Sequence, residues 1–129
     1  MNQDNIVLVA IHESKLIEPR AWLSTTWTIY ESLHTIINVR YNNNDAKERD
    51  YNITISQDDY DTIMDTLELA KRDDRKIFAF DVDTWAFKQY LNGEIIYRRL
   101  DSPITGIDEF EKLQVALEKL IKKARPAGQ

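Results

Sequence analysis

Asp81 and Asp83 form the residue pair whose type and spacing could do chemistry in this chain of 129 residues. Side chains two positions apart in an extended segment lie on one face, with about 7 Å between their Cα atoms. Two carboxylates placed in this way can bind a divalent cation through oxygen, or divide the roles of general acid and general base. The motif is short and the chain has 22 acidic residues, so a solvated strand face or the edges of a bulge is the favoured interpretation. A metal-dependent enzyme is therefore one alternative hypothesis.

A hairpin over residues 85–100 holds the second group of candidate residues. Asn92 and Gly93 predict a two-residue type I′ turn, because both central positions of that turn need a positive φ. With this turn Lys88 lies opposite Tyr97, and one face carries two aromatic and two basic side chains: Lys88, Tyr90, Tyr97 and Arg99. Such a face could stack on bases and contact phosphates, as in single-stranded nucleic-acid binding. It could equally bind a protein, since Tyr and Arg are enriched in protein interfaces.

The remaining residue types offer little for catalysis. His12 and His34 lie at predicted strand ends without a second metal-ligand spacing, and we interpret both as turn or surface residues. The chain has no cysteine, no serine in a Gly-x-Ser-x-Gly elbow and only three glycines, which leaves no glycine-rich phosphate loop. We therefore expect no catalytic residues, no metal and no cofactor, and a protein that is not an enzyme.

The overall charge favours a protein partner over a nucleic acid. The formal net charge is -5, whereas non-specific nucleic-acid binding depends on clustered Lys and Arg. An acidic balance keeps a protein soluble, and it also suits a partner with a basic surface, whose binding salt would weaken. These observations predict a non-catalytic domain that binds another protein.

Length and composition predict the domain organisation and the location. The chain is 43% hydrophobic, which suffices for a core, and its length corresponds to one domain over 1–129 with a frayed tail at 126–129. No stretch approaches the about 18 apolar residues of a membrane span, and the apolar run at 6–11 is too short for a signal peptide. The absence of cysteine fits a reducing compartment. We expect a cytoplasmic protein that does not contact a membrane.

Periodicity predicts the elements that position these residues. Strands are expected at 6–11, 25–31, 35–41, 51–56, 77–91 and 94–100, with 25–31 and 35–41 either as hairpin partners or as one bent strand. Helices are expected to follow Ser56 and Thr105, each of which has an Asp three residues later in a variant capping box. Residues 6–11 are apolar at both parities, as in a strand buried on both faces. The order predicts an α+β fold, with a mainly antiparallel twisted sheet of five to six strands and two helices packed on one face.

Two features of the strands leave alternatives open. Apolar side chains at 78–82 share one face and those at 85–87 the other, so either a β-bulge near Asp83 and Thr84 resets the phase or two strands meet there. A homodimer is also an open alternative, and the sequence does not decide whether the second face of the sheet meets water or another copy. It would pair a sheet edge that carries large aromatic residues: Trp22, Trp27 and Tyr30.

Segments 80–87, 90–97 and 103–112 resemble a pattern in small uncharacterised proteins of Gram-positive bacteria. In that pattern an acidic-Trp-aromatic strand leads to a hairpin and then to a Gly-Ile step into a terminal helix. Together with the strand and helix at 51–71, the resemblance implies a shared α+β fold. Small acidic proteins of this look are often immunity or inhibitor proteins, so by analogy the resemblance implies a role in binding another protein.

Overall fold

The computed structural model describes residues 4–14, 22–41, 49–73, 83–104 and 107–124. In these ranges the elements follow the order β1 (Ile6–Glu13), β2 (Trp22–Tyr30), β3 (His34–Tyr41), β4 (Arg49–Thr54), α1 (Gln57–Ala70), β5 (Thr84–Leu91), β6 (Glu94–Ser102) and α2 (Asp108–Ala124). The tail predicted at 126–129 lies outside the described residues. Neither described helix has the length and apolar character that crossing a membrane requires.

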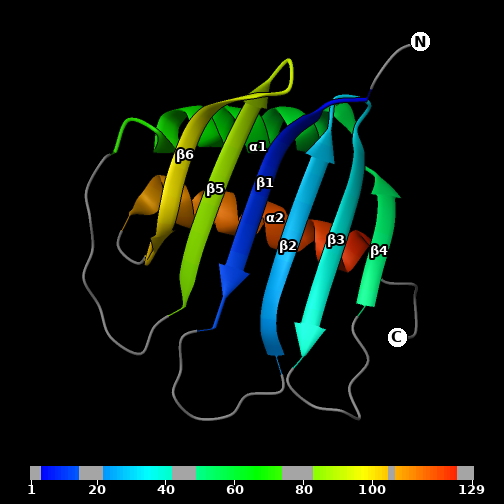
Figure 1. The fold of residues 1–129 in the computed structure, drawn as a ribbon, viewed down its shortest axis with the longest axis horizontal. Helices are drawn as coiled ribbons and strands as arrows, with labels where there is room; N and C mark the ends of the chain where they lie inside the picture. The colour runs from blue at the N-terminus through cyan, green and yellow to red at the C-terminus, as the bar shows by residue number, and fades with distance from the viewer. Residues whose placement is uncertain (1–3, 15–21, 42–48, 74–82, 105–106, 125–129) are drawn as a thin grey trace.

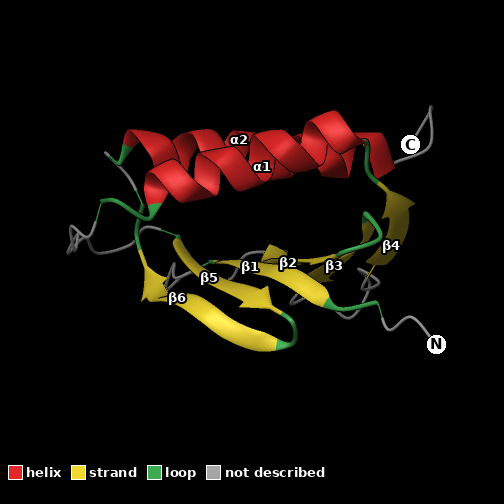
Figure 2. Cartoon of the chain, turned by 90° about the horizontal axis from the view of Figure 1, so that it is seen from above, coloured by secondary structure: helices red, strands yellow, loops and turns green. Residues whose placement is uncertain are grey.

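The strands form one antiparallel sheet in the order β4-β3-β2-β1-β5-β6. Both helices lie on one side of this sheet (Figure 2). Figure 1 looks onto the opposite side, with the strands in front of the helices. This arrangement confirms the predicted α+β fold with two helices on one face. β2 and β3 are hairpin partners, which decides between the two alternatives for residues 25–31 and 35–41.

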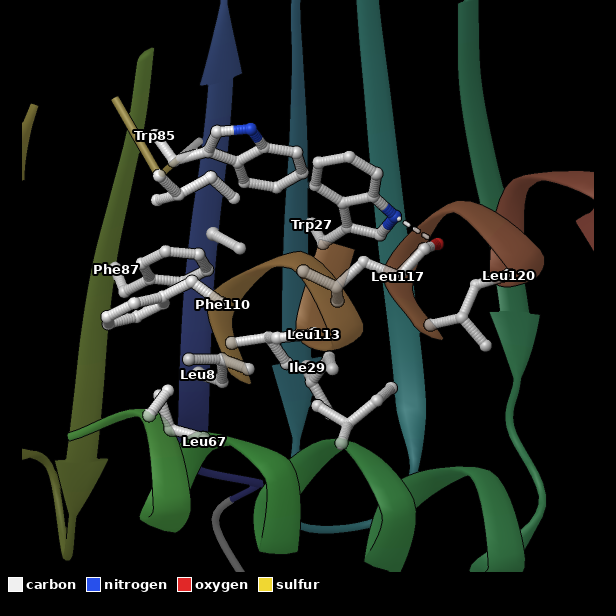
Figure 3. Packing of buried hydrophobic residues seen from close by; sticks show 14 of the residues in the cluster. Leu8, Trp27, Ile29, Leu67, Trp85, Phe87, Phe110, Leu113, Leu117 and Leu120 are labelled. Carbon is white, nitrogen blue, oxygen red and sulfur yellow. Dashed lines mark hydrogen bonds between the residues drawn. The ribbon is translucent and has the colours of Figure 1, made fainter. Parts of the chain in front are cut away.

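The core lies between the sheet and the helices, and aromatic rings form its centre (Figure 3). The rings of Trp27 and Trp85 stack with centroids 5.4 Å apart, and Phe87 continues the stack toward Phe110 of α2. Nε1 of Trp27 donates a hydrogen bond to the carbonyl oxygen of Leu117 at 3.0 Å, which satisfies the polar atom of a fully buried indole. These contacts attach α2 to β2 and β5.

β1 is a central strand, but described elements cover only one of its faces. Leu8 and Ala10 are fully buried beneath the helices. Val9 and Ile11 point to the opposite face and are half-buried. The prediction of a strand buried on both faces is therefore wrong for the described residues. Because β1 is apolar at both parities, one set of its side chains enters the core and the other forms an aliphatic centre on the uncovered face of the sheet.

Both helices present the apolar stripe that their periodicity predicts. The hydroxyl oxygen of Ser56 accepts a hydrogen bond from the amide of Asp59 at 3.0 Å, so α1 begins at its predicted cap. α2 begins at Asp108, and its predicted cap, Thr105, lies outside the described residues. The two stripes face the sheet through fully or almost fully buried side chains: Ile63, Leu67, Ala70, Phe110, Leu113, Leu117 and Leu120.

β5 and β6 form the predicted hairpin around the predicted turn. Asn92 and Gly93 have φ values of 51° and 83°, as a type I′ turn requires. Next to the turn, Tyr90 pairs with Ile95, which is the register that a two-residue turn gives. The sequence therefore locates the start of the hairpin correctly.

Beyond this point a β-bulge changes the register of the hairpin. Gln89 pairs with Tyr97, so Ile96 is an extra residue on β6 that has no counterpart on β5. Lys88 consequently lies opposite Arg98 and not opposite Tyr97. Because side chains alternate along a strand, this shift turns Tyr97 to the helix side of the sheet while Lys88 stays on the other side. The prediction that all four hairpin residues share one face is wrong.

The position of β2 corrects the predicted homodimer edge. β2 lies between β1 and β3, and Trp27 on this strand is fully buried against the helices. The edge strands of the described sheet are β4 and β6. Trp85 and Phe87 point into the core as their parity predicts, but residues 78–82 lie outside the described residues. The choice between a bulge and two strands near Asp83 stays a prediction.

Candidate functional site

The sequence predicts six binding residues: Asp81, Asp83, Lys88, Tyr90, Tyr97 and Arg99. Asp81 lies outside the described residues, and the structure divides the other five among three regions. Asp83 lies just before β5 and contacts β1. Lys88 and Tyr90 project from β5 away from the helices, whereas Tyr97 and Arg99 project from β6 toward them. The structure therefore keeps Lys88 with Tyr90 and Tyr97 with Arg99, and it separates both pairs from Asp83.

His12 contacts Asp83 on the helix side of the sheet. Its Nε2 lies 3.0 Å from Oδ2 of Asp83, and its ring stacks on Trp85 with a centroid distance of 4.2 Å. Only 14% of the His12 side chain is exposed, so the interpretation of this residue as a turn or surface histidine is wrong. Burial lowers the pKa of His12 below its ordinary value of 6.5, while the charges of Asp83 and Glu118 oppose that shift.

The chemistry of this pair is limited by its surroundings. A carboxylate that orients an imidazole is one part of many general-base sites. In the described part of the chain, however, no group of three or more His, Cys, Asp or Glu side chains is placed to hold a metal ion. The His12 ring is stacked on an indole that is 1% exposed. We interpret the contact as one that joins β1 to the segment before β5.

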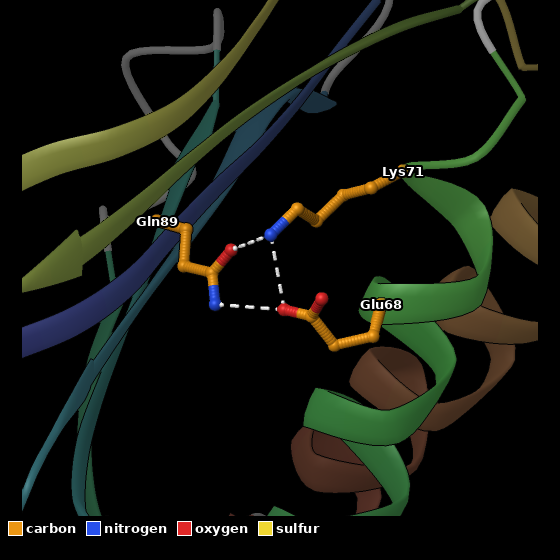
Figure 4. A network of polar contacts seen from close by, with 3 residues as sticks. All are labelled: Glu68, Lys71 and Gln89. Carbon is orange, nitrogen blue, oxygen red and sulfur yellow. Dashed lines mark hydrogen bonds and ion pairs between the residues drawn. The ribbon is translucent and has the colours of Figure 1, made fainter.

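A second polar cluster joins α1 to β5 (Figure 4). Nζ of Lys71 donates to Oε1 of Gln89 at 2.8 Å and to Oε1 of Glu68 at 3.0 Å, and Nε2 of Gln89 donates to Oε1 of Glu68 at 3.2 Å. Hydrogen bonds from Lys71 and then Gln89 lower the pKa of Glu68. Gln89 is buried, and the three side chains satisfy one another, so this cluster stabilises the fold.

Tyr97 and Arg99 both contact residues of the helix layer. Nζ of Lys71 lies 5.4 Å from the centroid of the Tyr97 ring, and the guanidinium of Arg99 lies 4.6 Å from that of Phe110. Burial raises the pKa of Tyr97, and the nearby charge of Arg99 opposes that shift. Two of the predicted binding residues therefore pack against the helix layer.

The face of the sheet opposite the helices, called the open face below, is not covered by any described element (Figure 1). Val9 and Ile11 of β1 lie at its centre, beside Thr28 and Thr26 of β2. Side chains of neighbouring strands complete a half-buried surface of aliphatic, threonine and tyrosine groups: Tyr30, Ile36, Ala86 and Tyr90. This composition, with an apolar centre and tyrosines, is typical of protein interfaces.

The open face carries charges of both signs. Lys88 and Arg98 lie opposite each other on β5 and β6. Asp50 lies on β4, at the other edge of the sheet, and accepts a hydrogen bond from Nδ2 of Asn38 at 2.6 Å. By the alternation of side chains along a strand, Arg40 of β3 and Glu13 of β1 also lie on the open face. The open face is therefore cationic toward β6 and carries charges of both signs on its other strands.

Exposed apolar side chains extend the open face at the β5–β6 turn. Ile95, which pairs with Tyr90, is 49% exposed, and the adjacent bulge residue Ile96 is also exposed. Isolated exposed aliphatic residues are common, but adjacent ones that continue an uncovered sheet surface indicate an interaction site.

Sequence reasoning left open what covers the second face of the sheet and did not identify the residues at its centre, because the strand order brings them together. β1 lies next to both β2 and β5, and the pairing of Val9 with Lys88 joins residues far apart in the chain. A usable signal was present in 6–11, where both parities are apolar. Because only one parity can face the two helices, the other parity had to reach the opposite face.

Comparison of the chain with models of protein families, with curated proteins and with solved structures finds no match. The function is accordingly inferred from the geometry of the chain itself.

Proposed function

We propose that this protein is a non-catalytic domain that binds another protein chain through the open face of its sheet. The observation that carries the proposal is the half-buried apolar centre at Val9 and Ile11, on a face that the described helices leave uncovered. An uncovered sheet face is ordinarily polar, with apolar residues only on the side of the core. A protein partner would remove these aliphatic groups from water, and each buried methylene contributes about 0.8 kcal/mol.

Charge gives the chemistry of the partner. Lys88 and Arg98 lie together at one side of the open face, so a matching surface presents carboxylates there around an apolar centre. The net charge of -5 alone predicts a basic partner, but it describes the whole chain and not this face. The same proposal includes a cytoplasmic location. It also includes the bacterial origin and the immunity or inhibitor role, which the resemblance implies.

The alternative functions have less support. A stacking platform for single-stranded nucleic acid needs aromatic and basic groups on one surface, whereas Tyr97 and Arg99 contact Lys71 and Phe110. A metal-dependent enzyme needs a second carboxylate beside Asp83, and its described partner is His12. The protein-binding hypothesis requires neither arrangement.

A capture experiment tests the proposal. The wild-type chain, the open-face variant Thr28→Arg and the helix-surface variant Thr62→Arg are immobilised and exposed to source lysate that also contains a differently tagged copy. Thr62 is exposed on α1, so Thr62→Arg makes the same residue exchange away from the open face and serves as the control. We expect one protein, or the tagged copy, to bind the wild type and the control but not Thr28→Arg. Equal binding to all three variants, recovery of nucleic acid, or no bound chain at all would contradict the proposal.

A further inference from the structure

We propose that a second copy of this chain covers the open face, in a two-fold symmetric dimer that stacks the two sheets face to face. The inference rests on the proposed function, because it names the partner of the same surface. It follows from three properties of the described sheet, which are its strand order, its distribution of charge and its size.

The strand order makes the centre of the open face self-complementary. β1 and β2 are the two central strands of the six. A two-fold axis parallel to the strands and between β1 and β2 places β1 of each copy over β2 of the other. The aliphatic Val9 and Ile11 of one copy then pack against the threonines Thr26 and Thr28 of its partner, which are their neighbours in the sheet. A closed two-fold arrangement of this kind uses the same patch on both copies.

The same axis brings opposite charges together. Because it reverses the strand order, β4 of each copy lies over β6 of the other. The registers place Asn52 over Arg98 and Asp50 two residues further along β4, within reach of the long Arg98 side chain. An axis perpendicular to the strands would place each strand over its own copy and would set Lys88 and Arg98 against the same cations. Like charges in an interface disfavour association, so the parallel axis is the favoured arrangement.

The open face approaches the size of a standard interface. Six strands at spacings of about 4.8 Å span about 24 Å, and strands of eight residues are about 26 Å long. The projected area is therefore roughly 600 Å², and the accessible area is larger because side chains roughen the surface. A standard interface buries about 800 Å² on each partner.

The two edges of the sheet are less suited to dimer formation. β6 carries the bulge at Ile96 and the charged residues Glu94 and Arg98. β4 has six residues, of which Arg49 and Asp50 are charged and exposed. Bulges, charges and short lengths are the features by which proteins prevent edge-to-edge pairing.

Sedimentation velocity over protein concentrations from about 1 to 100 µM tests the inference. We expect a concentration-dependent dimer for the wild type and for Thr62→Arg. Thr28→Arg introduces a cation at the centre of the proposed interface and should weaken dimerisation at least tenfold, which corresponds to about 1.4 kcal/mol. Circular dichroism and thermal unfolding establish that each variant is folded.

A charge exchange tests the orientation independently of the centre. Asp50→Arg and Arg98→Asp should each weaken the dimer, and the double variant should restore it, because the Arg98 side chain is long enough to reach Asp50 diagonally across the interface. A dimer that Thr28→Arg leaves intact would overturn the inference, as would single charge variants without effect. A wild type that stays monomeric, yet binds a different protein that Thr28→Arg does not bind, would overturn the inference and retain the proposed function. A monomer without any open-face partner would overturn both.

Discussion

The imidazole of His12 lies between a carboxylate and an indole, which come from Asp83 and Trp85 more than 70 residues further along the chain. Burial lowers the pKa of His12, so the neutral ring is the favoured form in the folded protein. As the pH falls below 6.5, the unfolded chain binds a proton at this residue before the folded chain does. The free energy of unfolding therefore decreases over this range and stops depending on His12 below its folded-state pKa.

Replacement of His12 should remove this pH dependence. For the wild type we expect the free energy of unfolding, measured with urea, to decrease between about pH 7 and pH 5, and for His12→Gln we expect a smaller decrease. Asp83→Asn removes a charge that raises the pKa of His12, so the NMR titration of the ring should shift to lower pH. A His34→Asn background leaves one imidazole signal, because the chain has two histidines. An unchanged pH dependence in His12→Gln would exclude this coupling.

At the scale of the elements, the β5–β6 hairpin contains one extra residue, Ile96, close to its turn. Deletion of Ile96 leaves Tyr90 paired with Ile95 and Gln89 paired with Tyr97, so every flanking side chain keeps its face. We expect the deletion variant to fold and the free energy of unfolding to change by less than about 1 kcal/mol, because Ile96 is exposed.

Deletion of Lys88 is the matched control for this prediction. β5 pairs with β1 without irregularity, so loss of Lys88 would move its buried residues out of register and cost at least about 3 kcal/mol. Chemical denaturation of the two deletion variants measures both values. Equal destabilisation by the two deletions would show that Ile96 is not a tolerated insertion.

The elements also show which parts of the fold the sequence predicts. Ser56 and the turn at Asn92 and Gly93 were identified correctly, because caps and tight turns depend on a few neighbouring residues. The bulge at Ile96 and the position of β1 between β2 and β5 were not, because they depend on pairing between distant strands. The candidate residues at Tyr97 and Arg99 were consequently assigned to the wrong face, and the residues at the centre of the open face were not identified.

At the scale of the whole molecule, the two layers differ in charge. α1 has no Lys or Arg, and its acidic side chains are numerous: Asp58, Asp59, Asp61, Asp65 and Glu68. The open face instead carries charges of both signs: Lys88, Arg98 and Arg40 with Asp50 and Glu13. Stacking two open faces places the helix layers on the outside of the dimer, where their negative charges are far apart and solvated. A net charge of -5 on each chain is therefore compatible with self-association through the sheet.

Hydrogen exchange distinguishes this arrangement from a dimer that pairs strand edges. β1 has hydrogen-bonded neighbours on both sides, whereas β4 and β6 each have one in the described sheet. We expect the amides of β1 to exchange most slowly and those of β4 and β6 to exchange fastest among the strands. Face-to-face stacking buries side chains but leaves the outer amides of both edges unpaired, so raising the protein concentration should not protect them. Protection of β4 or β6 to the level of β1 at high concentration, measured by mass spectrometry, would instead indicate edge pairing and contradict the stacked dimer.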